Sequence, residues 1–407
     1  MNVLVLSQYF RPESFRVNDL AAALVERGHR VTVLTGLPNY PGGRLFPGYS
    51  WRGPYRESFD GYRVRRVPHL PRGRGALRLA MNYVSFAASA SVLSPWLLRE
   101  PIDVALVYAP SPITACIPAL WLKRLRGIPV ALWVQDLWPE SLAATGAVRS
   151  PALLRRVGSM VRWIYRHCDL VLGQSAAFVA AIRTLCPEAK RVELLPNWYE
   201  SFYRPIDLEP DADERRELPP GFKLLFAGSL GAAQSLETIL DAAELLREQP
   251  IHWVFLGDGR RREWLAAEVV ARKLGERVHL LGWRPAERMP RYLAAADGLL
   301  VTLRREPIFE ATIPAKVQSS LAVGRPILAA LSGEPARVLA EAGAGVVVPA
   351  EDPRALADGA LALLAAGEEG RAAMGARGRA HAERHFDRDT LLARLEGWLE
   401  ELVRSPR

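Results

Sequence analysis

Residues 312–326 combine a helix start, a lysine and a helix stop in a way that could bind a diphosphate group. Pro314 stands where a helix is predicted to begin, Lys316 follows in its first turn, and the Gly-Arg-Pro sequence at 324–326 ends it. Because the helix follows an apolar strand predicted at 298–302, its N-terminus would meet the edge of a sheet. Backbone N–H groups and the helix dipole favour an anion there, and Lys316 would add a full positive charge. The alternative is a helix whose lysine contacts only solvent.

Two glycine-rich turns follow predicted strands in the same half of the chain. After the apolar runs at 223–226 and 253–256 they read Gly228-Ser229-Leu230-Gly231 and Gly257-Asp258-Gly259-Arg260. Glycine lets the backbone approach a ligand closely, so the two turns and Lys316 could surround one diphosphate. Neither turn is a dinucleotide-binding fingerprint, because Arg262 stands where the third glycine would be. Trp283 follows another apolar run and could stack on a nucleotide base or simply pack.

Two carboxylates follow a predicted strand in the first half. Asp136 comes after the apolar run at 130–134, where open α/β sheets place ligand-binding residues, and Glu140 comes four residues later. Asp136 could act as a general base or position a substrate, and the alternative is a cap for the turn that starts at Leu137. Glu140 could position substrate equally well.

No metal or other cofactor is expected from the sequence. Asp211 and Asp213 lie in a polar segment with no strand before them, which indicates a solvated position. His381 and His385 lie one helical turn apart among charged residues, which is typical of a surface. The three cysteines lack the spacing of a zinc site or a disulfide framework, which favours a reducing compartment.

Short apolar runs alternate with helical patterns along the chain, which predicts an α/β fold with parallel sheets. Strands are expected at 2–6, 31–35, 62–67, 104–108, 130–134, 170–172 and 192–195, and in a second series at 223–226, 253–256, 278–281, 298–302, 327–330 and 346–348. A polar, proline-broken segment starting near 205 separates the two series. The chain of 407 residues is long enough for two domains, predicted at 1–204 and 205–388.

The net charge of +9 is unevenly distributed, with the excess in the first half. It is concentrated in an arginine cluster made of Arg52, Arg56, Arg63, Arg65, Arg66, Arg72, Arg74 and Arg78. An anionic partner is expected, and an anionic membrane surface is favoured over nucleic acid because no nucleic-acid-binding motif is present. The alternative is a solvated, arginine-rich face.

Residues 79–98 contain no charged side chain and reach the length of a membrane span. Serines, an asparagine and a proline interrupt this stretch, so three interpretations stay open. It is a helix buried against the first sheet, a helix that dips into the bilayer beside the arginine cluster, or a true span. The chain start resembles a buried strand and not a signal peptide, so the expected location is the cytoplasm, peripheral on the inner face of the membrane.

Several motifs, in this order along nearly the whole chain, resemble those of glycosyltransferase family 4, especially the WbuB-type bacterial amino-sugar transferases of surface polysaccharide biosynthesis. They are Tyr9-Phe10-Arg11-Pro12-Glu13, residues 28–35, Gln135-Asp136-Leu137-Trp138-Pro139-Glu140, residues 228–234, residues 255–260 and Thr312-Ile313-Pro314-Ala315-Lys316. The resemblance implies a GT-B architecture, two Rossmann-like domains facing across a cleft, with the nucleotide on the C-terminal domain and the acceptor on the N-terminal one. A C-terminal helix at about 389–403 would pack back on the first domain.

The resemblance also implies roles for individual residues. The expected donor-binding residues are Gly228, Ser229, Gly231, Gln234, Gly257, Asp258, Gly259, Arg260, Trp283, Pro314, Lys316 and Gln318. The expected catalytic residues are Asp136, Glu140 and Glu310, and the expected acceptor or phosphate side holds Arg11, Glu13 and Arg16. 

The chain departs from the family pattern at two places. Many members carry two glutamates separated by seven residues, whereas this chain has Glu310 and Gln318, of which Gln318 could still hydrogen-bond a ribose. Many also carry a basic residue in the turn at 228–234, which is uncharged here. The diphosphate charge would therefore rest on Lys316, on helix ends and on Arg260 or Arg11.

The function expected is a retaining, metal-independent glycosyltransferase. It would move a sugar from a nucleotide sugar, expected to be UDP-linked, to a lipid-diphosphate-linked glycan in O-antigen or exopolysaccharide biosynthesis. Two alternatives remain at this point: a nucleotide-sugar 2-epimerase of the same architecture, and a non-catalytic partner subunit of a transferase.

Overall fold

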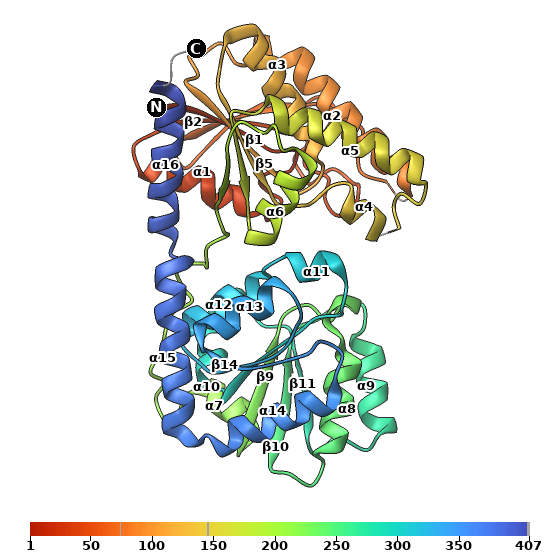
Figure 1. Ribbon diagram of the computed structural model, residues 1–407, viewed down its shortest axis with the longest axis vertical. Coiled ribbons are helices and arrows are strands. Elements are labelled where there is room, and N and C mark those ends of the chain that lie inside the picture. The colour runs from red at the N-terminus through yellow and green to blue at the C-terminus, as the bar shows by residue number, and fades with distance from the viewer. Residues whose placement is uncertain (74, 145, 405–407) are drawn as a thin grey trace. The chain divides into compact units, whose positions relative to one another are not determined.

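The computed structural model describes residues 1–73, 75–144 and 146–404, which group into two compact units (Figure 1). The N-terminal unit contains residues 1–195 and the chain from Leu392 onward, and the C-terminal unit contains residues 196–391. The expected boundary near residue 205 falls instead after Leu195. The polar segment after it belongs to the C-terminal unit because its short helix α7 (Asp213–Glu217) packs on α10 (Met289–Ala295).

The N-terminal unit is built on an eight-stranded sheet in the order β3-β4-β2-β1-β5-β6-β7-β8. Its strands are β1 (Asn2–Leu6), β2 (Arg30–Gly36), β3 (Arg56–Phe59), β4 (Tyr62–Val67), β5 (Val104–Ala109), β6 (Val130–Val134), β7 (Leu170–Gly173) and β8 (Val192–Leu194). The central strands β5 and β6 are buried along their whole length, as is usual where helices cover both faces of a parallel sheet. Only β3 runs antiparallel, to β4 at the sheet edge.

Helices of the N-terminal unit connect these strands. They are α1 (Arg16–Glu26), α2 (Ala76–Leu97), the 3-10 turn η1 (Ile113–Cys116), α3 (Ile117–Arg126), α4 (Glu140–Ala144), α5 (Pro151–His167) and α6 (Ala176–Leu185). Ser150 caps α5 by accepting a hydrogen bond from the N–H of Leu153. The last helix, α16 (Arg388–Arg404), joins this unit from Leu392 on, where Glu396 accepts hydrogen bonds from Arg27 and His29.

The C-terminal unit has a six-stranded parallel sheet in the order β11-β10-β9-β12-β13-β14. Its strands are β9 (Phe222–Ala227), β10 (Ile251–Leu256), β11 (Val278–Gly282), β12 (Gly298–Thr302), β13 (Ile327–Ala330) and β14 (Gly345–Val348). The helices besides α7 and α10 are η2 (Ala232–Gln234), α8 (Leu236–Leu245), α9 (Arg262–Ala271), η3 (Ala286–Arg288), α11 (Pro307–Ala311), α12 (Ala315–Val323), α13 (Glu334–Ala342), α14 (Pro353–Ala365) and α15 (Gly367–His385). Apolar clusters on both faces of the sheet form the core.

Helix α2 has one buried and one exposed face, both largely apolar. Its buried face includes Tyr83, Phe86 and Ala90, whereas Leu77, Met81, Val84, Val92 and Trp96 form an exposed stripe, with Val84 63% and Trp96 61% exposed. It is the one helix among the described residues that is long and apolar enough to cross a membrane. The helix therefore packs against the first sheet with one face, as one of the three interpretations expected, and leaves the other face exposed.

The arginine cluster does not form one solvated surface. Arg66 is buried, pairs with Glu57 and donates to the backbone carbonyls of Gly36 and Arg11. Arg65 pairs with Glu100 at 3.3 Å. Arg74 lies outside the described residues. Exposed guanidinium groups remain at several of the other positions, so the cluster combines structural and surface residues.

Candidate functional site

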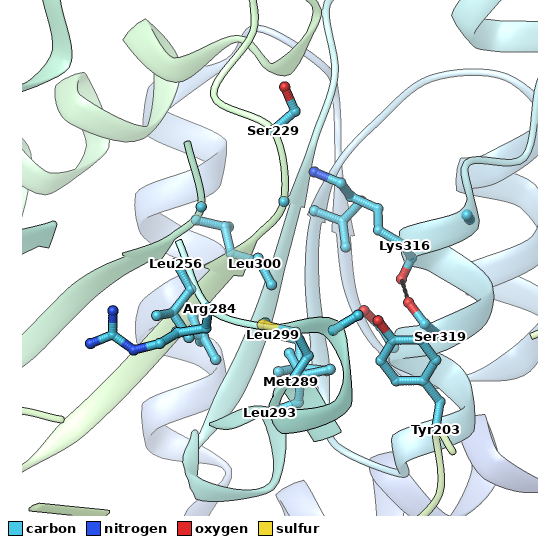
Figure 2. Close-up of a pocket in the computed structure, with 18 of the residues that line it drawn as sticks. Tyr203, Ser229, Leu256, Arg284, Met289, Leu293, Leu299, Leu300, Lys316 and Ser319 are labelled. Carbon is cyan, nitrogen blue, oxygen red and sulfur yellow. Dashed lines mark hydrogen bonds between the residues drawn. The ribbon is translucent and has the colours of Figure 1, made fainter. Parts of the chain in front are cut away.

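A cavity of about 500 Å³ opens in the C-terminal unit at the carboxyl ends of its central strands. Strand order reverses between β9 and β12, because β9, β10 and β11 follow one another in one direction and β12, β13 and β14 in the other. Open α/β sheets bind ligands at such a reversal. Six of the expected donor-binding residues line this cavity, namely Gly228, Ser229, Gly257, Asp258, Trp283 and Lys316. Figure 2 labels two of them, Ser229 and Lys316.

The two glycine turns lie against each other at the cavity wall. The N–H of Leu230 donates to the carbonyl of Asp258 at 2.9 Å, and the N–H of Gly228 donates to Leu256 at 2.9 Å. Gly257 has a φ of +151°, and a Cβ there would lie 1.8 Å from the carbonyl oxygen of Gly228. Glycine is therefore required at position 257, because any side chain would separate the two turns.

Lys316 extends from the first turn of α12 toward the first glycine turn (Figure 2). Pro314 precedes this helix as its N-cap residue, and Gly324 ends it in the left-handed conformation, as the sequence predicted. The Lys316 ammonium group donates to the side-chain oxygen of Gln234 and lies 4.0 Å from the ring centroid of Phe226. Burial lowers the pKa of Lys316 to about 7. No carboxylate of the described chain pairs with it, so an anion in the cavity would meet an uncompensated cation.

The cavity face of α12 is formed by Ala315, Lys316, Ser319 and Ser320. Residues three and four positions apart share one face of a helix. Gln318 points elsewhere: it is 1% exposed, and its amide donates to the backbone carbonyl of Asn197 at 2.6 Å. The prediction that Gln318 contacts the ligand therefore has no support in the geometry. Counting from Lys316 in helical steps would have found Ser319, which the sequence analysis missed.

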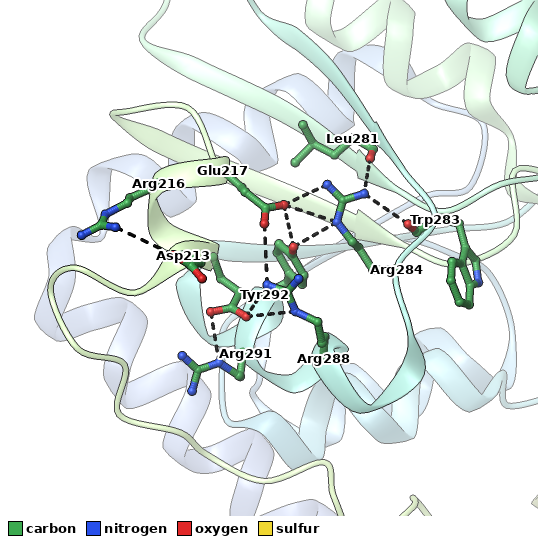
Figure 3. A network of polar contacts seen from close by, with 10 residues as sticks. Asp213, Arg216, Glu217, Leu281, Trp283, Arg284, Arg288, Arg291 and Tyr292 are labelled. Atoms are coloured by element: carbon green, nitrogen blue, oxygen red, sulfur yellow. Dashed lines mark hydrogen bonds and ion pairs between the residues drawn. The ribbon is translucent and has the colours of Figure 1, made fainter.

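A polar network holds the loop that follows β11, which also lines the cavity (Figure 3). Arg284 donates to Glu217 at 2.8 Å, to the hydroxyl of Tyr292 at 3.0 Å and to the backbone carbonyl of Leu281 at 2.7 Å. The Tyr292 hydroxyl itself donates to Glu217 at 2.6 Å. Trp283 is 66% exposed and its ring turns away from this network, so a flat face remains available at the cavity.

Other expected residues of the C-terminal unit do not line the cavity. These are Gly231, Gln234, Gly259, Arg260, Pro314, Gln318 and Glu310. Gln234 still acts at the site through its hydrogen bond with Lys316. Arg260 is exposed on the second glycine turn, and Glu310 is half-buried on the short helix α11.

The expected carboxylates of the N-terminal unit lie after β6, as predicted. Asp136 is partly buried and accepts hydrogen bonds from Ser141, Ser111 and the indole N–H of Trp138, the last at 3.2 Å. Burial raises the pKa of Asp136, and these hydrogen bonds oppose the shift. Glu140 is exposed at the start of α4. Both carboxylates are thus near the carboxyl edge of the sheet.

Glu13 and Arg11 have structural partners that the sequence did not reveal. Glu13 is buried, and its carboxylate accepts hydrogen bonds from the backbone N–H groups of Phe10, Asn39 and Tyr40 at 2.6–3.0 Å. Arg11 pairs with Asp60 at 2.9 Å. Glu13 therefore joins the loops after β1 and β2, while Arg16 lies half-buried at the start of α1.

No group of three or more His, Cys, Asp or Glu side chains with metal-binding geometry occurs within residues 1–73, 75–144 and 146–404. Two cationic side chains, Arg284 and Lys316, line the cavity.

Two family models match the chain in succession. Residues 14–198 match the model described as "Glycosyl transferase 4-like domain", and residues 221–366 match "Glycosyl transferases group 1". The match at 221–366 falls within the C-terminal unit, and the match at 14–198 covers most of the N-terminal unit and ends three residues into the C-terminal one.

Similar whole proteins agree with these matches. WcaI of Escherichia coli (strain K12), named as a glycosyl transferase of colanic acid biosynthesis, is 26% identical over 339 residues, which cover 80% of this chain and 82% of WcaI. The probable glycosyltransferase WbjE of Pseudomonas aeruginosa is 29% identical over 247 residues, or 58% of this chain and 60% of WbjE. The structure of Anabaena HepE in complex with UDP has a TM-score of 0.73 at 16% identity, covering 98% of this chain and 100% of HepE.

Proposed function

This chain is a glycosyltransferase of family 4 with the GT-B fold, and on that premise we propose that it transfers a sugar from a UDP-sugar to a lipid-diphosphate-linked glycan. The reaction would retain the configuration at the anomeric carbon and need no metal ion. It would take place during assembly of a surface polysaccharide, either O-antigen or an exopolysaccharide. The biosynthetic role of WcaI supports this setting.

The observation that carries the donor half of the proposal is Lys316 in its cavity. An ammonium group without a carboxylate partner lies beside two glycine turns and at a helix N-terminus. This combination suits a diphosphate, because backbone N–H groups and a cation act on the same oxygens. The UDP complex of HepE, which has the same fold, supports uridine as the nucleoside.

The same lysine supports the chemical step. When the bond between the anomeric carbon and the diphosphate oxygen breaks, negative charge develops on the leaving diphosphate. Lys316 would stabilise that charge more in the transition state than in the substrate. In a retaining transfer the leaving diphosphate can accept the proton of the incoming hydroxyl. Asp136 would then position the acceptor on the N-terminal unit.

We infer metal independence from the lysine at the cavity. Lys316 and the helix N-terminus would take the role that a divalent ion has in other transferases. We therefore expect chelation by EDTA to leave the transfer rate unchanged. Recovery of a lost rate by Mg²⁺ or Mn²⁺ after chelation would contradict this part of the proposal.

The exposed stripe of α2 supports a peripheral location at the inner face of the cytoplasmic membrane. Leu77, Met81, Val84, Val92 and Trp96 lie along a helix of 22 residues without an acidic side chain. Next to it, α3 exposes Trp121 and Leu125. An apolar helix face of this kind lies in the plane of a bilayer surface, where a lipid-linked acceptor would be found.

Nucleotide release tests the whole proposal. The protein would be incubated with a panel of UDP-sugars, with and without a lipid-diphosphate-linked acceptor, and the products identified by mass spectrometry. A transferase releases UDP only when acceptor is present and extends the acceptor by one sugar. A 2-epimerase would change the sugar without acceptor, and a non-catalytic subunit would change neither substrate.

A further inference from the structure

We propose that Arg72 and three tyrosines, Tyr9, Tyr40 and Tyr83, form a phosphate-binding site on the N-terminal unit, which holds the diphosphate of the lipid-linked acceptor. This inference rests on the proposed function and adds to it the residues that recognise the acceptor. None of the motifs in the sequence pointed to Arg72 as a substrate residue, because it appeared there only as a member of the arginine cluster.

The backbone around Arg72 is fixed by its neighbours. Arg72 lies between β4 and α2, and its N–H donates to the side-chain oxygen of Asn39 at 2.7 Å. On the loop after β2, Gly43 has a φ of +73°, and a Cβ there would lie 1.8 Å from the carbonyl oxygen of Arg72. The loops after β2 and β4 are therefore packed tightly together, so Arg72 is presented from a defined position.

The side chain of Arg72 is held by aromatic residues alone. Its Nη1 donates to the hydroxyl of Tyr9 at 3.2 Å and to that of Tyr83 at 3.4 Å. Its guanidinium carbon lies 5.2 Å from the ring centroid of Tyr40. No described residue accepts a hydrogen bond from Nε or Nη2, and no described carboxylate pairs with the group. The N–H groups of Nε and Nη2, which point to the same edge of the guanidinium plane, are available to donate to two oxygens of one phosphate.

Arg66 provides a comparison within the same segment. Its guanidinium group donates to Glu57 and to the backbone carbonyls of Gly36 and Arg11, so its charge and its donors are used inside the fold. Among the described residues, Arg72 has neither a carboxylate nor a carbonyl acceptor for its side chain. The two arginines therefore differ in role, and only Arg72 is arranged to bind an external anion.

The site shares a sheet edge with Asp136. Tyr83 contacts Trp138, with ring centroids 5.9 Å apart, and the indole N–H of Trp138 donates to Asp136 at 3.2 Å. Strand order in this sheet reverses between β1 and β5. Tyr9 follows β1 on one side of this point, and Asp136 follows β6 on the other side. One acceptor could therefore place its phosphate at Arg72 while a nearby sugar hydroxyl meets Asp136.

Direct binding of farnesyl diphosphate tests the site without requiring transfer. Excess UDP would first saturate the cavity beside Lys316, so that the probe reports on the N-terminal unit alone. We expect Arg72→Gln to weaken binding of the probe at least about tenfold, and Arg72→Lys to weaken it as well, because a lysine keeps the charge but not the paired donors. Tyr83→Phe, which removes one supporting hydroxyl, should weaken it less. Arg52→Gln, an exposed arginine of the same segment, is the matched control and should bind normally.

Two further measurements separate the possible outcomes. Turnover with a lipid-linked acceptor should show a raised KM for the acceptor in Arg72→Gln, while UDP affinity and the melting temperature stay unchanged. Sedimentation with phosphatidylglycerol vesicles should be the same for Arg72→Gln and parent, and a loss there would assign Arg72 to membrane lipid and overturn the proposal. Equal probe binding by parent and Arg72→Gln would also overturn it, even if the protein is an active transferase. If instead UDP release never depends on acceptor while farnesyl diphosphate still binds through Arg72, the proposed function fails and the anion site remains.

Discussion

Lys316 donates a hydrogen bond from Nζ to Gln234, and this neutral amide is its only hydrogen-bonding side-chain partner in the described part of the chain. Its other close neighbour is the ring of Phe226, at 4.0 Å. Buried without a counter-ion, the amine loses part of its preference for the charged form, and its pKa falls to about 7. A bound diphosphate would restore that preference.

Replacement of Lys316 by alanine should abolish most transfer activity. A charge-assisted hydrogen bond to a partly buried diphosphate is worth about 1.5–3 kcal/mol, or roughly ten- to a hundredfold in affinity or rate. Calorimetric titration with UDP and steady-state kinetics would measure the loss. Arg354→Ala, which removes an exposed cation from α14 of the same unit, is the control. Near-normal UDP affinity and turnover in Lys316→Ala would show that the diphosphate binds elsewhere.

Above neutral pH, Lys316 should take up a proton when the donor binds. Lys316 is mostly neutral in the free protein above its pKa of about 7 and becomes charged when the diphosphate binds. Affinity should therefore be highest below pH 7 and fall as the pH rises from there toward the higher pKa of the complex. Titrations of a UDP-sugar at pH 8 in buffers of different ionisation enthalpy would detect the proton, and Lys316→Met should remove it. Equal heats in all buffers would contradict the assignment.

The same lowered pKa has a consequence for stability. Between about pH 7 and the ordinary lysine pKa, the unfolded chain holds the Lys316 proton and the folded chain does not. The free energy of unfolding should therefore rise with pH across this window in the absence of ligand. Denaturant titrations at several pH values should show a smaller rise for Lys316→Met than for the parent.

Ser319 and Gln318 should respond differently to substitution. Ser319→Leu fills the cavity face of α12 and should weaken UDP binding with little change in melting temperature. Gln318→Ala removes the hydrogen bond to the carbonyl of Asn197, which should cost about 0.5–1.5 kcal/mol of stability and spare UDP affinity. If Gln318→Ala weakens UDP binding and Ser319→Leu does not, Gln318 is the residue that binds the ligand, as the family pattern of Glu310 and Gln318 implies.

The fold could be predicted from the sequence because the central strands of both sheets are parallel and buried. Continuous apolar runs such as 104–108 and 298–302 are typical of strands that are covered on both faces, and the structure has strands at these positions. The structure also contains β3, which was not predicted because it has no continuous apolar run. Its residues Arg56–Phe59 are mostly polar and form an antiparallel strand at the sheet edge. Neither the spacing nor the number of apolar residues there predicts a strand.

The sequence predicted which residues meet at one place where the local backbone decides the position. The glycine turns and the start of α12 follow strands directly, so Gly228, Gly257 and Lys316 arrive at one cavity. The sequence did not reveal side-chain partners that the tertiary environment decides. Glu13 looks like a substrate carboxylate in sequence, yet it satisfies three backbone N–H groups of neighbouring loops. Arg72 looked like a surface charge, because nothing local shows that three tyrosines surround it.

Asp136→Asn should lower kcat more than it lowers UDP affinity. The carboxylate belongs to the N-terminal unit, where hydrogen bonds from Trp138, Ser141 and Ser111 fix its orientation. Burial raises its pKa, so the acidic limb of the rate profile should have an apparent pKa above the ordinary aspartate value. That limb should disappear in the asparagine variant. A loss of UDP binding equal to the loss of kcat would place Asp136 at the donor instead.

The exposed stripe of α2 should bind anionic vesicles through apolar contact as well as charge. Val84→Glu with Val92→Glu puts two carboxylates in the middle of the stripe, where they would have to leave water to enter the bilayer surface. We expect sedimentation with phosphatidylglycerol vesicles to fall at least about tenfold, because each buried valine contributes about 1.5 kcal/mol or more. Ala180→Glu with Thr184→Glu adds the same charge on α6 of the same unit and is the control.

Salt separates the two contributions to membrane binding in the parent protein. Interactions of Arg78 and other exposed arginines with the leaflet weaken at high ionic strength, whereas burial of Leu77, Val84 and Trp96 does not. Binding should therefore decline with added salt and level off above zero. The glutamate double variant should lose this salt-resistant fraction and keep UDP affinity, because its changes lie outside the C-terminal unit. Complete loss of parent binding at high salt would show that the stripe stays in water and that charge alone attracts the protein to the membrane.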